Sequence, residues 1–471
     1  MWFRRRQRRQ TARRHWPLLD RDQTPRELRE VIRLSERLIA RRGEPSGLAL
    51  AVAIVDAIGS MDEAETAAFL AAIADRFAPD RRRLEQAIDA WRARHDQRTL
   101  LELGDAVEPP RQELFRRINM APGGTAALVG LRARLLDLLP EQPQLAPVDA
   151  DLRHLLASWF NRGFLQLEQI SWDSSAAVLE RLIRYEAVHQ IRGWDDLRRR
   201  LASDRRCYAF FHPALPGEPL IFVEVALTRG LPEAIGPLID PDRAAADPGG
   251  ADTAVFYSIS NCQPGLRGVS FGNLLIKQVA ARLEDELPRL RTFATLSPLP
   301  GFAAALQRRD SEQGFTDARL RNLIEDDADE LCELAGTKDP VEALFALLAS
   351  GPPRPKVVGQ ALVRLALAYL LQIRRGLRVA DSVAHFHVAN GARLERVDAD
   401  ADASDLGGGS HGVMVNYVYD LERVEANHER YAETGRVATA QSLSSLVKRV
   451  ERAWADVQPA AEEAPRHRPA R

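Results

Sequence analysis

The spacing of apolar residues changes once along this chain, and that change restricts the fold more than any other feature of the sequence. Over residues 22–160 apolar side chains recur every three or four positions, as on one face of a helix. The first such face holds Leu28, Val31, Ile32, Ser35, Leu38 and Ile39. From residue 207 short runs rich in β-branched and aromatic residues follow. The sequence therefore predicts an all-helical bundle followed by an α+β domain over residues 161–455.

Signals for the ends of helices are frequent in the bundle. Thr24 and Glu27, with a proline between them, predict a helix start with a capping box, and Gly43 predicts the end of that helix. Ser60 and Glu63 predict a second capping box. We find no catalytic constellation in this half of the sequence and expect it to serve packing or assembly.

The α+β domain contains six runs typical of strands, at residues 207–212, 220–227, 254–260, 291–297, 384–388 and 413–421. A turn-forming segment joins the first two and predicts a hairpin. Residues 274–287 are helical by pattern, and residues 310–377 predict a mostly helical insert. We therefore expect a mixed sheet interrupted by helices.

Composition excludes several classes of protein. A net charge of −1 gives no whole-chain field for nucleic acid or an anionic membrane. No run approaches the ~20 apolar residues that span a bilayer. The cysteines, at positions 207, 262 and 332, are too few and scattered for a disulfide framework or a zinc site. Residues 1–21 are basic and acid-poor; they fit a transit peptide, but a disordered arm is favoured. With a disordered tail over residues 456–471, we expect a cytoplasmic protein.

Residues 267–273, RGVSFGN, fit two kinds of site. As Gly-x-Ser-x-Gly they would present Ser270 as the nucleophile of a hydrolase, on a sharp turn directly after a strand. As a glycine-containing loop between a strand and a helix, they would bind a pyrophosphate through main-chain N–H groups and the positive helix end. The preceding strand ends near Ser260, and NCQPGL intervenes. The pyrophosphate loop is therefore favoured.

Four ordered blocks carry a family resemblance: YSISNCQPGLRGVSFGNLLIKQV, LRTFATLSPLPGF, AHFHVANGARLERV and GVMVNYVYDL. Their order and spacing resemble the malonyl-CoA decarboxylase family, in which a GNAT-like mixed-sheet catalytic domain follows a helical domain. The resemblance covers the whole α+β domain. It implies conversion of malonyl-CoA to acetyl-CoA and carbon dioxide through a thioester enolate. It also implies no cofactor, neither biotin nor metal, and a homotetramer built through the helical domains.

The resemblance implies a role for particular residues of this sequence. The family's active-site serine falls on Ser297, as a proton acceptor that hydrogen-bonds the malonyl group. The family's histidine falls on His387; because histidine titrates near neutrality, it suits the proton donor to the α-carbon. The implied substrate contacts are Ser258, Arg267, Gly268, Val269, Ser270, Phe271, Gly272, Asn273 and Tyr419. Some members have glutamate where Ser270 stands, so only the main chain of that residue is expected to contribute.

Each of these residues also has a structural interpretation. Ser297 could satisfy a turn at the end of a strand, and Tyr419 could be a core tyrosine with a bonded hydroxyl. In AHFHV, the strand period places His385 and His387 on one face, and a core role is the better prediction for His385. The two histidines lack a third ligand for a metal at a suitable spacing. The acidic run at 398–405 lacks the glycine and glutamate of a calcium loop, so we expect a solvated loop.

Other functions remain open at this point. A GNAT N-acyltransferase would use the same CoA loop but would need an amine acceptor. A catalytically silent acyl-CoA-binding regulator would bind malonyl-CoA without loss of carbon dioxide. A serine hydrolase would react at Ser270 with a fluorophosphonate probe, and we expect no such labelling.

Overall fold

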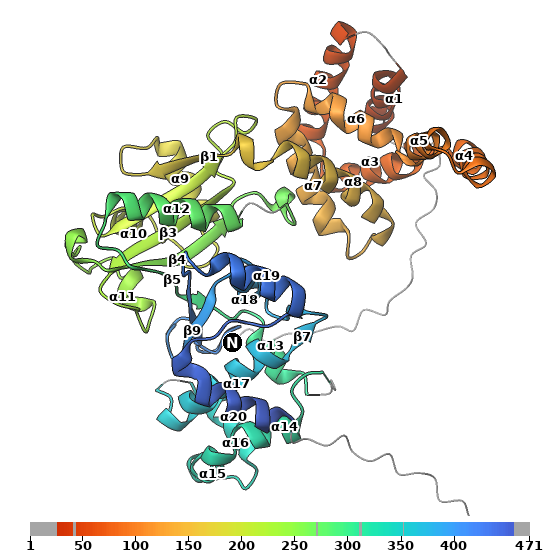
Figure 1. Cartoon of the computed structure of the whole chain (residues 1–471). Coiled ribbons are helices and arrows are strands. Elements are labelled where there is room, and N and C mark those ends of the chain that lie inside the picture. Colours follow the sequence, from red (N-terminus) through yellow and green to blue (C-terminus); the bar gives the residue numbers. More distant parts are fainter. Residues whose placement is uncertain (1–25, 41–43, 270–271, 310–312, 352, 456–471) are drawn as a thin grey trace, which may run out of the picture. The chain divides into compact units, whose positions relative to one another are not determined.

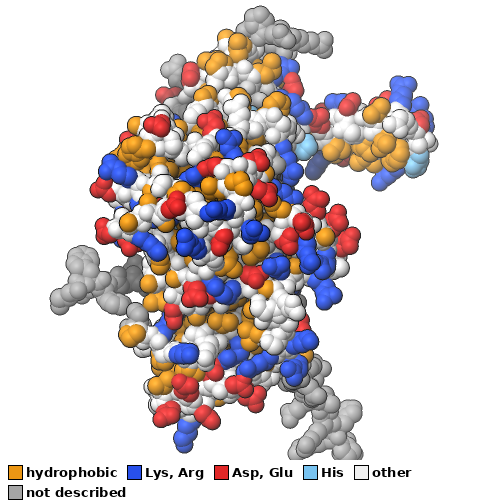
Figure 2. Space-filling model, turned by 60° about the vertical axis from the view of Figure 1, so that its left-hand side comes forward, with side chains coloured by type: hydrophobic (Ala, Val, Ile, Leu, Met, Phe, Trp, Pro, Cys, Tyr) orange, Lys and Arg blue, Asp and Glu red, His pale blue; other side chains and the backbone are white. Residues whose placement is uncertain are grey.

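The computed structural model describes residues 26–40, 44–269, 272–309, 313–351 and 353–455 (Figure 1). The chain divides into two compact units. The first comprises Met1–Asn161 together with Pro213–Leu215 and Gln263–Val269, and the second comprises the remaining residues. No helix in the described ranges is long and apolar enough to cross a membrane. On the face seen in Figure 2, acidic and basic side chains are interspersed, in keeping with the small net charge.

The first unit is built from helices in its described part. They are α1 (Arg26–Ala40), α2 (Glu44–Ser60), α3 (Glu63–Arg76), α4 (Arg81–Arg94), α5 (Gln97–Val107), α6 (Pro110–Asn119), α7 (Gly124–Leu138) and α8 (Ala146–Trp159). The face expected on α1 is buried, from Leu28 to Leu38. Phe69 and Phe115 are fully enclosed in the same core. The all-helical prediction for this half is confirmed.

One predicted helix start in this unit is wrong, and another cannot be compared. Ser60 is the last residue of α2, and the capping box belongs to Asp62 and Glu65. The Asp62 carboxylate accepts the Glu65 N–H at 2.8 Å, and the Glu65 carboxylate accepts the Asp62 N–H at 3.1 Å. Because α2 runs on to Ser60, that residue cannot take the extended backbone of an N-cap. Thr24 and Gly43 lie outside the described residues.

An eight-stranded mixed sheet organises the second unit. Its strands are β1 (Gln166–Ile170), β2 (Arg205–Phe211), β3 (Ile221–Thr228), β4 (Thr253–Asn261), β5 (Thr292–Thr295), β6 (Ser297–Pro298), β9 (Arg393–Asp398) and β10 (Met414–Val418). The order is β1-β2-β3-β4-β5-β10-β6, with β9 beside β10. Only the β4–β5 pair is parallel among these strands; the predicted β2–β3 hairpin is confirmed.

Helices cover both faces of this sheet. Cys207 and Ala209 of β2 pack against leucines of α9 (Ala176–Tyr185) and α10 (Trp194–Arg200). Between them, Tyr208 points the other way and its hydroxyl contacts Glu286 at the end of α12 (Gly272–Glu286). Successive strand residues point to opposite faces, so β2 and β3 are buried on both sides. This double cover explains why they appear in the sequence as continuous apolar runs.

The helical insert is also present. It contains α14 (Asp317–Leu323), α15 (Ala328–Ala335), α16 (Pro340–Ala349) and α17 (Lys356–Gln372). Smaller elements flank it: α11 (Gly236–Ile239), α13 (Phe302–Gln307), the β7–β8 hairpin (Arg374–Arg375 and Arg378–Val379), α19 (Val424–Thr434) and α20 (Ser444–Ala455). The predicted class, α+β with a helical insert after an all-helical region, is confirmed.

The expected strand at AHFHV is wrong. These residues lie in a helix, α18 (Ser382–Ala389). Asp381 is its N-cap, and one carboxylate oxygen accepts the N–H groups of Val383 at 2.9 Å and Ala384 at 3.0 Å. The buried side chains of α18 are Ala384, His387 and Val388, which follow the helical period rather than the strand period. His385 and His387 therefore do not share a face.

Candidate active site

Ser297 lies where the chain passes from strand β5 to strand β6. β5 ends at Thr295, and Ser297 opens the two-residue β6, which pairs with β10 through Val415. Pro298 follows directly and fixes the backbone there. The Ser297 side chain is 6% exposed, and its hydroxyl donates to Thr295 Oγ1 at 3.0 Å.

His387 meets Ser297 from helix α18. Its Nε2 atom lies 2.9 Å from Ser297 Oγ, and its Nδ1 atom lies 2.9 Å from the Tyr419 hydroxyl. The Tyr417 ring stacks on the imidazole, with ring centroids 4.7 Å apart and planes at 24°. The structure thus brings together three residues singled out in the sequence, Ser297, His387 and Tyr419.

Strand β10 supplies both tyrosines. Tyr417 lies within the strand and Tyr419 just after it, so the two-residue period turns both rings to the same face. The Tyr419 N–H donates to the Phe293 carbonyl of β5 at 2.8 Å, which holds the residue in line with the sheet. On the same strand, the side-chain amide of Asn416 donates from Nδ2 to the Thr295 carbonyl at 3.0 Å. Backbone pairing therefore fixes the tyrosines relative to Ser297.

The electrostatics of His387 differ from the expectation. Burial lowers the pKa of His387 to about 3, so the expected titration near neutrality is wrong. Enclosed by other side chains, the charged imidazolium would lose its hydration, and no carboxylate of the described residues compensates for that loss. Burial also raises the pKa of Tyr419, which keeps its hydroxyl protonated. The site therefore holds a neutral imidazole between two hydroxyl groups.

The hydrogen bonds select one tautomer of that imidazole. A neutral imidazole has one N–H donor and one acceptor nitrogen. With the Ser297 hydroxyl donating to Thr295 Oγ1, the tautomer that we assign has Nε2–H donating to Ser297 Oγ. Nδ1 then accepts from the Tyr419 hydroxyl. The arrangement presents a hydroxyl and a ring N–H at one point, which suits stabilisation of an anion or delivery of a proton.

Sequence reasoning missed three supports of this site: Thr295, Tyr417 and Asp381. Thr295 could have been found because it precedes Ser297 by one strand period. Tyr417 precedes Tyr419 by the same interval. Asp381 stands before a short apolar run that ends in Asn-Gly, which is a signal for a capped helix.

The side-chain hydrogen bonds of Ser258 in the described part of the chain are made with Glu186 and Ser260. Its hydroxyl donates to the two oxygens of the Glu186 carboxylate, at 2.7 and 2.8 Å. Ser260 donates to the same carboxylate at 3.1 Å, and Glu224 lies opposite Ser258 across the strands. The described contacts of Ser258 thus belong to a buried network of carboxylates and hydroxyls.

The predicted CoA run extends over both units. Arg267, Gly268 and Val269 follow a short 3-10 turn, and Gly268 has φ +80°, a backbone conformation that favours glycine. Ser270 and Phe271 lie outside the described residues, while Gly272 and Asn273 open helix α12. In the first unit, Arg132 Nη1 donates to the Gly265 carbonyl at 2.7 Å and to the Arg267 carbonyl at 2.8 Å. The expected order of strand, loop and helix is present.

The remaining candidates have structural contacts. His385 Nδ1 lies 2.9 Å from the Tyr431 hydroxyl. The acidic run is only partly solvated, because Asp402 is 7% exposed and accepts the Ser404 hydroxyl at 2.6 Å. Within the described ranges, no group of three histidine, cysteine or acidic side chains is placed to hold a metal ion.

Comparisons with known proteins agree on one family. The model of the malonyl-CoA decarboxylase C-terminal domain matches residues 163–457, and that of the N-terminal domain matches residues 77–160. Mitochondrial malonyl-CoA decarboxylase of Rattus norvegicus is 35% identical over 410 residues, 83% of each chain. The protein of the same name from Anser anser anser is 35% identical over 402 residues, 81% of this chain and 79% of the relative.

Solved structures give the same result. A crystal structure of malonyl-CoA decarboxylase from Rhodopseudomonas palustris is 48% identical with a TM-score of 0.80, and the match covers 90% of this chain and 100% of that one. A second, from Agrobacterium vitis, is 45% identical with a TM-score of 0.76 and covers 89% and 99%. Both halves of the sequence are matched, and this chain therefore belongs to the malonyl-CoA decarboxylase family.

Proposed function

We propose that this protein decarboxylates malonyl-CoA to acetyl-CoA and carbon dioxide. One observation carries the proposal beyond family membership: Ser297 Oγ and His387 Nε2 lie 2.9 Å apart in a buried position. The residues come from elements far apart in the sequence, β6 and α18. A strand-terminating serine would not require an imidazole from another element at hydrogen-bond distance.

The chemistry requires donors and a proton. Loss of carbon dioxide leaves an electron pair on the α-carbon, delocalised onto the thioester oxygen as an enolate. The Ser297 hydroxyl and the His387 Nε2–H are adjacent, and on substrate binding each would turn from its present acceptor, Thr295 Oγ1 or Ser297 Oγ, to the thioester oxygen. A preorganised donor of this kind contributes about 10²–10³ in rate. Burial strengthens the effect, because little water competes for the oxygen.

His387 acts in this proposal as a neutral acid. One proton must be added to the α-carbon to form acetyl-CoA, and Nε2 carries it. A neutral imidazole is a weaker acid than an imidazolium, but an enolate carbon is a strong enough base to take its proton. Tyr419 donates to Nδ1 and keeps the proton on Nε2. Solvent returns the proton to the imidazole after the product leaves.

The substrate is held by its CoA tail. The run from Arg267 to Asn273 precedes and opens α12, so free N–H groups and the positive helix end would face the pyrophosphate. Ser270 contributes only main chain in this proposal. Neither biotin nor a metal is required, because hydrogen bonds and positioning stabilise the enolate. Activity that persists with a strong chelator and with avidin would support this part.

The direct test is incubation with malonyl-CoA, with acetyl-CoA followed by mass and carbon dioxide by trapping. Ser297→Ala and His387→Asn should each lower kcat by at least ~10² while CoA affinity remains. His385→Asn is the matched control on the same helix and should keep its activity. Full activity in both Ser297 and His387 variants would refute the assignment. Acyl-CoA turnover only in the presence of an amine would indicate an N-acyltransferase instead.

Assembly and location complete the proposal. We propose a cytoplasmic homotetramer assembled through the helical first unit, in which Leu100, Leu101 and Met120 are exposed. Light scattering coupled to size exclusion gives the mass of the particle, and a monomer at working concentration would contradict the tetramer. Cell fractionation tests the location, since the curated relatives carry the word mitochondrial in their names.

A further inference from the structure

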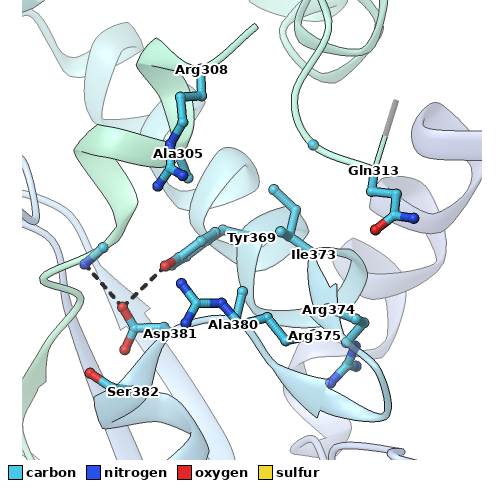
Figure 3. Close-up of a pocket in the computed structure, with 12 residues that line it drawn as sticks. Ala305, Arg308, Gln313, Tyr369, Ile373, Arg374, Arg375, Ala380, Asp381 and Ser382 are labelled. Carbon is cyan, nitrogen blue, oxygen red and sulfur yellow. Dashed lines mark hydrogen bonds between the residues drawn. The ribbon is translucent and has the colours of Figure 1, made fainter. Parts of the chain in front are cut away.

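A pocket of about 400 Å³ opens in the second unit beside the start of α18 (Figure 3). Its walls come from α13 with the residue before it, from the end of α17, from the β7 hairpin and from the residues that begin α18. None of the residues that line it is Ser297, His387 or Tyr419. The pocket is therefore separate from the hydrogen-bonded site already described.

The charged side chains of this pocket are three arginines and one aspartate. Arg308, Arg374 and Arg375 have no ion pair with any acid in the described part of the chain. Arg374 Nη1 is buried without a hydrogen-bond partner among the described residues, while its Nη2 donates to the Leu371 carbonyl at 2.8 Å. Burial lowers the pKa of Arg374, since its charge is incompletely hydrated. An anion bound here would supply the hydrogen-bond acceptor and the opposite charge that the Arg374 guanidinium lacks among the described residues.

The single aspartate is already engaged. Asp381 is 1% exposed and accepts the Gly301 N–H at 3.1 Å and the Tyr369 hydroxyl at 3.3 Å. Its other oxygen caps α18. One negative charge against three positive ones leaves the described lining of the pocket with a net positive charge.

Two of the three arginines, Arg308 and Arg375, converge on one point of the wall. Arg308, which directly follows α13, and Arg375, the second residue of β7, extend toward the Tyr369 hydroxyl (Figure 3). Burial and Asp381 raise the pKa of Tyr369, and the nearby charges of Arg375 and Arg308 oppose that rise. An occupant would therefore meet two guanidinium groups and a phenol at the same place.

We propose that this pocket binds a small multivalent anion, a polycarboxylate or a phosphate-bearing metabolite. Guanidinium groups bind both kinds of oxygen anion through paired N–H donors. The volume exceeds what one carboxylate fills, so the ligand carries more than one anionic group or a phosphate on a larger body. Asp381 and Tyr369 form the wall, so the bound anion lies next to the cap of the helix that holds His387.

The test is titration calorimetry with citrate, and separately with inorganic phosphate, at constant ionic strength. We expect one site per chain, and the ratio of the two affinities distinguishes a carboxylate from a phosphate ligand. Arg308→Gln combined with Arg375→Gln should weaken binding at least about tenfold, which corresponds to about 1.4 kcal/mol, because each substitution removes a charge-assisted donor to the anion.

The chain offers a closely matched control. Arg309 is the neighbour of Arg308, and Arg378 lies opposite Arg375 in the β7–β8 register, yet neither lines the pocket. Arg309→Gln combined with Arg378→Gln removes the same charge and should leave affinity within about twofold. Equal weakening by both double variants, or no binding of either anion to the wild type, would overturn the proposal. Melting curves without anion show whether each variant is folded, and the readout does not depend on decarboxylation.

Discussion

At the scale of single residues, Tyr419 sets the chemical state of the imidazole. Tyr419→Phe removes the hydroxyl that lies 2.9 Å from His387 Nδ1 and leaves the ring in place. The proton can then move to Nδ1, so Nε2 is less often the donor. We expect kcat to fall about 10-fold or more with KM little changed, as for an interaction made mainly in the transition state. Steady-state kinetics check this, and an unchanged kcat would contradict the tautomer assignment.

The buried imidazole also predicts a dependence of stability on pH. Burial lowers the folded-state pKa of His387 to about 3 from an ordinary value of 6.5. Between about pH 6.5 and pH 3, His387 is therefore protonated in the unfolded chain but neutral in the folded chain. The stability that His387 provides is complete above that pH and is lost as pH falls toward 3, at up to about 1.4 kcal/mol per pH unit.

His387→Asn removes this protonation and should reduce the slope of the free energy of unfolding against pH below about pH 6.5. Urea unfolding of both proteins at a series of pH values gives the two slopes. The comparison uses the difference in slope, because the substitution itself changes stability by a constant amount. Parallel curves between about pH 6 and pH 4 would show that the imidazole is not held neutral.

The sequence predicted which residues form the site but not how they contact one another. Ser297 and His387 were named from a resemblance, and the structure supplies what the sequence lacks, a 2.9 Å contact between them. Proximity across 90 residues depends on how β6, α18 and β10 pack, and no local pattern contains it. The state of His387 was mispredicted for the same reason, since the pKa depends on enclosure by residues such as Tyr417.

At the scale of elements, helix α18 depends on its N-cap. Asp381→Ala removes the two capping bonds within α18, a third bond to the Gly301 N–H, and the partner of the Tyr369 hydroxyl. Loss of a cap costs about 1 kcal/mol. Because α18 carries His387 toward Ser297, a small displacement should lower kcat by ~10-fold or more.

Asp381→Asn is the control for that prediction, because asparagine also caps helices well. Unfolding experiments and kinetics are measured on both variants. Recovery of both stability and kcat in the asparagine variant supports a capping role. An alanine variant with unchanged kcat would show that the position of α18 does not depend on this residue.

The same helix shows why one element was assigned wrongly. AHFHV is apolar and contains β-branched and aromatic residues, so alternation of its histidines favoured a strand. A run this short fits either period, and the decision rests on its ends. Asp381 before it and Gly391 after it are helix signals, and Gly391 has φ +83° in the structure. Strands β2 and β3 were predicted well because their apolar runs are buried on both faces, whereas β1 and β9, which are only partly buried, were not predicted.

At the scale of the whole molecule, the change of apolar period predicted two regions of different class, and the structure has both an all-helical region and a mixed sheet. The sequence could not predict that Gln263–Val269, which follows β4, belongs to the first unit. That assignment depends on buried contacts with α7. Arg132 of α7 is 1% exposed, and its side chain bonds Asp149 and two carbonyl groups of this segment.

This arrangement links the helical unit to the predicted CoA run. Arg132→Met removes both bonds to the carbonyls of Gly265 and Arg267, so the start of that run loses its fixed backbone. We expect KM for malonyl-CoA to rise about tenfold with kcat within about threefold, because ground-state and transition-state binding weaken together. Arg134→Met is the matched control. Arg134, two residues along, makes its described hydrogen bonds to Ile58, Met61 and Thr66 rather than to Gln263–Val269. Arg134→Met should lower the free energy of unfolding by a comparable amount and leave KM unchanged. Equal KM values in the two variants would show that Arg132 does not support CoA binding.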